Sequence, residues 1–90
     1  MTPDQLARAG EALRHGEDWR RPLARLLGPH HPAGPRDEID PRMVSRWASG
    51  AMEIPPWVPE ALARLTRETG ERLLDVADEL DAEAEPRPRI

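Results

Sequence analysis

The sequence contains no cysteine, which excludes disulfide bonds, thiolate metal sites and thiol nucleophiles together. It has no apolar run near the roughly 20 residues that a membrane span requires. Its N-terminus lacks the basic stretch and apolar run of a signal peptide. We therefore expect a small cytoplasmic protein that does not contact a membrane.

Residues suited to catalysis are equally scarce. The chain has no glycine-rich phosphate-binding loop, and Ser45 and Ser49 are its only serines. Two of its three histidines are adjacent at His30 and His31, and His15 lies in another segment, which is a poor arrangement for a metal ion. The sequence predicts a binding protein and not an enzyme, with no cofactor and no metal.

All thirteen basic residues are arginines, and the chain also has seventeen acidic residues. The two signs are unevenly placed along the chain. Between Arg20 and Arg46 there are six arginines and three acids, whereas from Ala51 onward there are five arginines and ten acids. The net charge of −4 therefore hides a basic middle segment and an acidic C-terminal half.

Capping and breaking signals divide the first half of the chain. The capping box Thr-Pro-Asp-Gln at residues 2–5 predicts a helix over 3–15, which Gly16 ends. A second helix is expected over 20–27. Residues 29–38 hold three prolines and a glycine, a composition typical of a loop.

A third helix is predicted between Asp40-Pro41, which supply a cap and a first-turn proline, and Gly50. Its inner face carries Val44 and Trp47. Its outer face is polar and rich in arginine, and consists of Arg42, Ser45, Arg46 and Ser49.

A long helix is expected to begin at Trp57. Its apolar residues recur at steps of three and four, at Val58, Leu62, Leu65, Thr69, Leu73, Val76 and Leu80. The stripe keeps its phase across Gly70, which favours one helix over two helices that meet there. Residues 83–90 have no apolar periodicity, and we expect them to be disordered.

The two middle helices resemble the helix-turn-helix of lambda-repressor and Cro-type regulators. The matching features are Leu23-Ala24 ahead of the turn glycine Gly28, the cap at Asp40, the Val-x-x-Trp pattern in the next helix and the glycine that closes it. Small anti-CRISPR-associated regulators are similar in size and layout. The resemblance covers about 2–69, and it implies an all-α bundle of four to five helices.

The resemblance also implies a phage-like regulator of transcription that binds double-stranded DNA through the second helix of the pair. Arg42 and Arg46 would then read guanine edges, and Ser45 and Ser49 would allow close approach. Other arginines would reach phosphates or a groove, namely Arg20, Arg21 and Arg36. One departure is the connection between the helices, because eleven residues separate Gly28 from Asp40. We expect an extended loop there, which either reaches a phosphate or a groove through Arg36, His30 or His31 or is an insertion that takes no part in binding.

The C-terminal helix indicates how two copies would pair. We divide the chain into a DNA-binding domain at 1–69, a helical extension at 70–82 and a tail at 83–90. The apolar stripe is the predicted dimerisation surface, formed by Leu65, Thr69, Leu73, Val76 and Leu80. A homodimer would act as a repressor, or as an autorepressor, on an inverted repeat. The alternative is that this segment folds back on the first helix and completes a monomeric core.

A second hypothesis assigns the same scaffold to protein interaction, as an antitoxin, an antirepressor or an inhibitor of a nucleoprotein complex. Its basis is the acidic C-terminal half, which is suited to a basic protein partner. An exposed basic face on the third helix would favour DNA, whereas acids that cover this face would favour a protein partner.

Overall fold

The computed structural model describes residues 1–15 and 18–84. In this part of the chain every regular element is a helix: α1 (Pro3–Leu13), α2 (Arg20–Leu27), the short 3-10 helix η1 (Gly28–His30), α3 (Pro41–Ser49) and α4 (Trp57–Glu83). The predicted all-α fold, with an extended connection before α3 and a long C-terminal helix, is confirmed.

The capping box that predicted α1 forms as expected. The Thr2 amide donates to Gln5 Oε1 at 2.8 Å, and the Gln5 amide donates to Thr2 Oγ1 at 3.1 Å. The helix ends at Leu13 rather than at residue 15, and the Arg14 amide closes its last turn on the Gly10 carbonyl at 2.9 Å. Gly16, the predicted stop, lies outside the described residues.

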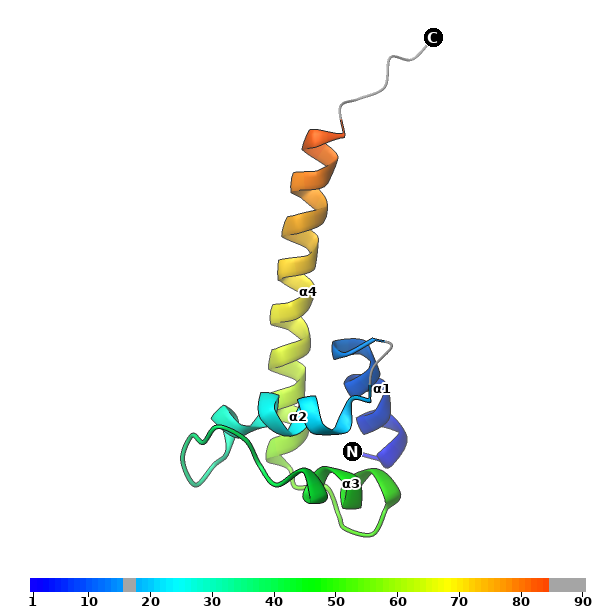
Figure 1. Cartoon of the computed structure of the whole chain (residues 1–90), viewed down its shortest axis with the longest axis vertical. Helices are drawn as coiled ribbons and strands as arrows, with labels where there is room; N and C mark the ends of the chain where they lie inside the picture. The colour runs from blue at the N-terminus through cyan, green and yellow to red at the C-terminus, as the bar shows by residue number, and fades with distance from the viewer. Residues whose placement is uncertain (16–17, 85–90) are drawn as a thin grey trace.

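The first three helices pack with the start of α4 around one core, and we call this unit, which extends to Thr69, the head (Figure 1). Trp19 and Trp47 are buried in it, whereas Trp57 is half-buried. Gly10 lies directly under the Trp19 ring, so that even a methyl group at this position would overlap the indole. The buried hydrophobic residues are Leu6, Trp19, Leu23, Ala24, Leu27, Ile39, Val44, Trp47, Ile54, Val58, Ala61 and Leu62.

The connection between α2 and α3 is a loop that closes on itself. The Arg36 amide donates to the Gly28 carbonyl at 3.1 Å, and the Ile39 amide donates to the Ala24 carbonyl at 3.0 Å. A side chain at Gly28 would overlap the backbone of 36–38. The small residues at 24 and 28 therefore let the end of the loop lie against α2, and these two hydrogen bonds form a neck that fixes the start of α3.

The fourth helix is continuous across Gly70, as predicted. Its 27 residues rise about 40 Å, and the molecule measures 60 × 26 × 19 Å because the outer part of α4 leaves the head (Figure 1). The segment does not fold back on α1. The helix runs to Glu83, one residue past the predicted extension, and 85–90 of the predicted tail lie outside the described residues. No helix in the described ranges has the length and apolar content of a membrane span.

Candidate nucleic-acid interface

Helix α3 has one buried side and one exposed side. Val44 and Trp47 are 0% and 2% exposed and lie in the core. Asp40 caps the helix by accepting from the Arg42 amide at 2.9 Å, and Gly50 ends it with a φ of 80°, which is favourable only for glycine. The helix is therefore fixed at both ends and along its inner side.

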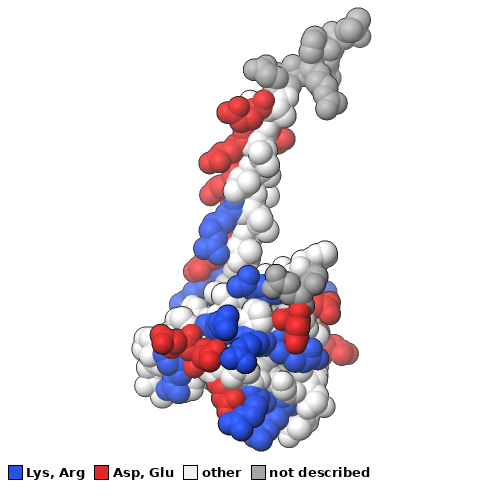
Figure 2. All heavy atoms as spheres, in the orientation of Figure 1, with Lys and Arg blue, Asp and Glu red and all other residues white. Residues whose placement is uncertain are grey.

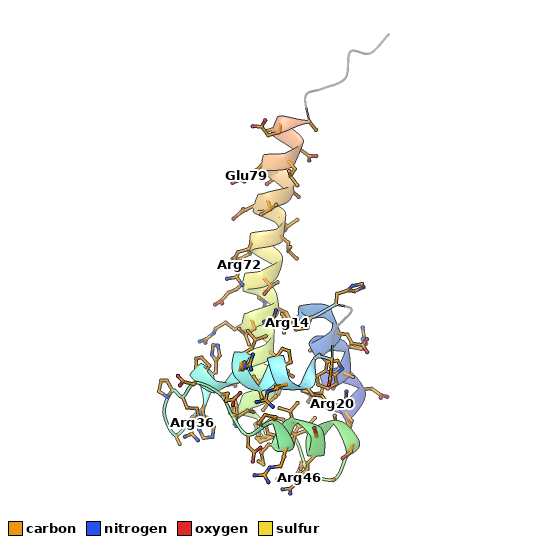
Figure 3. The ribbon with its side chains drawn as sticks, in the orientation of Figure 1. Arg14, Arg20, Arg36, Arg46, Arg72 and Glu79 are labelled. Atoms are coloured by element: carbon orange, nitrogen blue, oxygen red, sulfur yellow. The ribbon has the colours of Figure 1, made fainter. Side chains whose placement is uncertain are left out.

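The exposed side of α3 presents Arg46 at the end of the molecule farthest from the tip of α4, where its side chain points away from the head (Figure 3). Within the described ranges, the Arg46 guanidinium makes no ion pair and no side-chain hydrogen bond. Ser45 is exposed on the same face. This face offers uncommitted hydrogen-bond donors to a ligand.

Arg42 differs from Arg46 because it is paired. Its Nε lies 3.2 Å from both Asp40 carboxylate oxygens, and its Nη2 lies 3.0 Å from Oδ2. These hydrogen bonds lower the pKa of the Asp40 carboxyl and raise the pKa of Arg42. The sequence analysis treated Arg42 and Arg46 alike, although the cap two residues before Arg42 was a signal for this pair.

The Ser49 side chain is also engaged in hydrogen bonds within the chain. Its hydroxyl donates to the Arg46 carbonyl at 3.1 Å and accepts from the Ala51 amide at 3.4 Å. It therefore stabilises the turn after α3. Of the four predicted residues on this face, the two with uncommitted side chains are Arg46 and Ser45.

Arginines of α2 form a second basic area. Arg20 lies 4.8 Å from the centre of the Trp19 ring and 3.4 Å from an Asp18 oxygen, so two contacts hold its guanidinium. Arg21 is exposed. Figure 2 shows arginines spread across the head with a few acids between them and arginines again at the α3 end. The face of the head in this view is rich in arginine, although residues 1–69 contain as many acids as arginines.

Arg36 lies on the loop and well apart from Arg46 (Figure 3). It borders a cavity of about 320 Å³ between the loop, α3 and the start of α4, which Trp47 and Trp57 also line. In the described part of the chain, Trp47 Nε1 is buried without a hydrogen-bond partner. Glu38 Oε2 is also buried and accepts no hydrogen bond, but it lies 3.7 Å from Arg25 Nε in an ion pair. No sequence pattern predicted this cavity, because its walls come from segments far apart in the chain.

The histidine pair has a local role. His31 Nδ1 accepts from the Ala33 amide at 3.0 Å, and its ring lies 5.4 Å from that of Trp57. In the described ranges no group of three histidine or acidic side chains could hold a metal ion.

Comparison of the chain with models of protein families, with curated proteins and with solved structures gave no match. The likeness to helix-turn-helix regulators therefore stays a prediction from the sequence.

Proposed function

We propose that the protein is a sequence-specific double-stranded DNA-binding regulator, without catalytic activity, that places α3 in the major groove. The exposed face of α3, with the uncommitted Arg46, carries this proposal. Nine residues give α3 a length of about 13 Å, comparable with the groove width of about 12 Å. Arg46 is suited to a bidentate contact with guanine O6 and N7, and Ser45 is short enough for close approach.

The arginines of α2 would supply the sequence-independent part of the binding energy. Arg21 is exposed on the helix that packs against α3, where a phosphate contact would orient the head on the duplex. Binding of promoter DNA in this way would compete with transcription, which is the action of a repressor.

The test starts from the unmodified chain and a randomised duplex pool, from which bound DNA is selected and sequenced. Fluorescence anisotropy on the selected duplex then compares Arg46→Ala with Arg14→Ala, which removes the same charge from the opposite side of the head (Figure 3). We expect Arg46→Ala to weaken binding by about 1–3 kcal/mol, roughly 5–150-fold, and Arg14→Ala to have little effect. Selection without sequence enrichment, or equal losses in both variants, would contradict the proposal.

A second candidate function is that of a protein-interaction module, favoured by the acidic and partly apolar surface of α4 beyond Gly70. This function predicts that the selection enriches no DNA sequence and that Arg46→Ala leaves partner binding unchanged. The two functions are therefore separated by the same experiment.

A further inference from the structure

The outer part of α4 exposes an apolar strip. Leu73, Val76 and Leu80 are 65%, 50% and 62% exposed, although they lie on one face of the helix. They belong to a seven-residue pattern whose seam positions are Thr66, Thr69, Leu73, Val76, Leu80 and Glu83. Beside the seam, small residues recur at the same spacing, at Gly70, Ala77 and Ala84. A strip of this kind is typical of a helix that pairs closely with another helix.

We propose that a second copy of the chain covers this strip and that the two α4 helices pair antiparallel, crossing between Leu73 and Val76. Each Leu73 then packs against the partner's Val76. Each Thr69 lies opposite the partner's Leu80. The small residues of the two helices face each other and allow close approach.

The position of the head on α4 decides the direction of pairing. Lower on the helix, the seam face is already occupied, because Leu62, Ala63 and Thr66 face α1 residues Gln5 and Ala9 across a shallow hollow. Figure 1 shows α1 beside the lower part of α4, and Figure 2 shows the uncharged strip rising on that same side. A parallel partner that continued along the seam would run into α1 and bring the two heads together.

An antiparallel partner avoids this collision. Its α4 ends at Glu83, and in the register above this residue lies beside Thr66, the last residue along α4 that borders the hollow with α1. The exposed part of one helix is therefore matched in length by the exposed part of the other.

Charge favours the same direction. Arg72 and Glu79 are seven residues apart, and Figure 3 shows both on one side of α4. In an antiparallel pair Arg72 lies beside the partner's Glu79, and its own Glu79 lies beside the partner's Arg72, so two ion pairs form. In a parallel pair Glu83 would face the partner's Glu83, and the acidic outer ends would lie side by side (Figure 2).

The direction of pairing has a consequence for DNA that depends on the proposed function. At a rise of about 1.5 Å per residue, Trp57 lies about 26 Å from the crossing point, and the two copies of Trp57 are about 52 Å apart. Because α3 lies at the outer end of each head, the two Arg46 side chains point away from each other. An inverted repeat on one duplex requires recognition helices about 34 Å apart on the same side. The dimer therefore holds two DNA segments, one at each end, in place of the single inverted repeat expected from the sequence.

Charge exchange tests the pairing without DNA. Analytical ultracentrifugation of the full chain is compared for Arg72→Glu, Glu79→Arg and the double variant. Each single change places like charges together and should weaken dimerisation by roughly tenfold, and the double variant should restore it. Losses that simply add in the double variant, or a wild-type chain that stays monomeric at about 1 mM, would overturn the proposal.

Cysteine cross-linking tests the direction itself, because the chain has no cysteine of its own. In the antiparallel dimer two copies of Glu83→Cys are about 25 Å apart and do not form a disulfide, whereas a mixture of Glu83→Cys and Thr66→Cys does. Rapid self-linking of Glu83→Cys would establish parallel pairing and overturn the proposal.

Two differently labelled copies of the selected duplex test whether one dimer holds two DNA segments. The wild-type dimer should retain the second duplex on beads that carry the first, and Val76→Asp, which places a charge in the seam, should bind DNA without bridging. A cross-linked antiparallel dimer that binds no DNA would contradict the proposed function alone. A dimer that binds one duplex and never retains a second would contradict the bridging arrangement.

Discussion

Asp40 has two tasks at the start of α3. Its carboxylate accepts the Arg42 amide and so caps the helix, and it also pairs with the Arg42 side chain. An exposed pair of this kind contributes little to stability, so a phosphate or a base can compete for Arg42. Arg42 and Arg46 therefore differ although they look equivalent in the sequence. The Arg46 side chain is free to bind a ligand, whereas the Arg42 side chain must first break its hydrogen bonds to Asp40.

Replacing Asp40 with asparagine should strengthen DNA binding. Asparagine is as good an N-cap as aspartate, so α3 keeps its start, while the loss of the carboxylate releases Arg42 and removes a charge that repels phosphate. We expect affinity to rise by roughly fivefold. Asp37→Asn, an exposed loop acid, provides the matched control for charge alone and should give a smaller gain. Equal gains in the two variants would show that Arg42 is not restrained by Asp40.

The same pair predicts a pH dependence. Hydrogen bonds from the Arg42 side chain and amide hold the pKa of Asp40 below its usual 3.8, so the folded chain binds this proton more weakly than the unfolded chain. The stabilisation is thus fully present only well above the ordinary pKa of 3.8 and is lost as the pH falls through the lowered pKa. We expect the melting temperature of the wild type to exceed that of Asp40→Asn by a small amount at pH 7, because the pair is exposed, and this difference should narrow between pH 7 and pH 3. A gap that stays constant would contradict this assignment.

At the scale of elements, the packing of α1 on Trp19, the residue that precedes α2, depends on the absence of a side chain at Gly10. The Trp19 ring occupies the space that a Cβ would need, and Trp19 is only 5% exposed. Alanine is normally the better residue inside a helix by about 1 kcal/mol. Here the overlap outweighs this gain, because neither the ring nor the helix can move without opening the core.

Gly10→Ala should therefore destabilise the head by about 1–3 kcal/mol, in spite of its higher helix propensity. Chemical denaturation followed by circular dichroism measures the change. Glu11→Ala, at the exposed neighbouring position, should stay within about 0.5 kcal/mol of wild type. A stabilised Gly10→Ala variant would mean that α1 and Trp19 are not in contact.

Elements whose signals are local could be predicted from the sequence. The capping box at residues 2–5 and the Asp40-Pro41 start of α3 depend only on near neighbours, and both form. The continuity of α4 across Gly70 followed from a periodic stripe. The closure of the loop on Gly28 and the commitment of Ser49 could not be predicted, because they depend on which backbone groups approach each other after folding.

At the scale of the whole molecule, charge is divided along the long axis. The head carries the arginine-rich surface, whereas the outer segment of α4 is acidic (Figure 2). Residues 70–90 hold seven of the acids and three of the arginines, so they carry the entire net charge of −4. Because acids repel phosphate over about 10 Å at moderate salt, we expect this segment to weaken any non-specific association of the head with DNA.

A chain that ends at Thr69 has no net charge and should bind unrelated duplexes more tightly than the full chain. The gain should be largest in low salt and should disappear near 0.5 M salt, since screening removes the repulsion. Anisotropy titrations across salt concentrations measure it. An equal affinity of both chains for unrelated DNA in low salt would show that α4 does not influence non-specific binding.

The two hydrogen bonds of the neck make the position of α3 independent of the length of the loop before it. Hydrogen bonds at Gly28 and at Ala24 hold the start of α3, so 31–35 bridge two points that are already joined. Residues could be gained or lost between these points in the course of evolution without a change in the angle of α3, because closure of a longer surface loop is inexpensive. The same stretch is a natural place to insert a fluorescent label or an affinity tag that reports on the head while leaving α3 undisturbed.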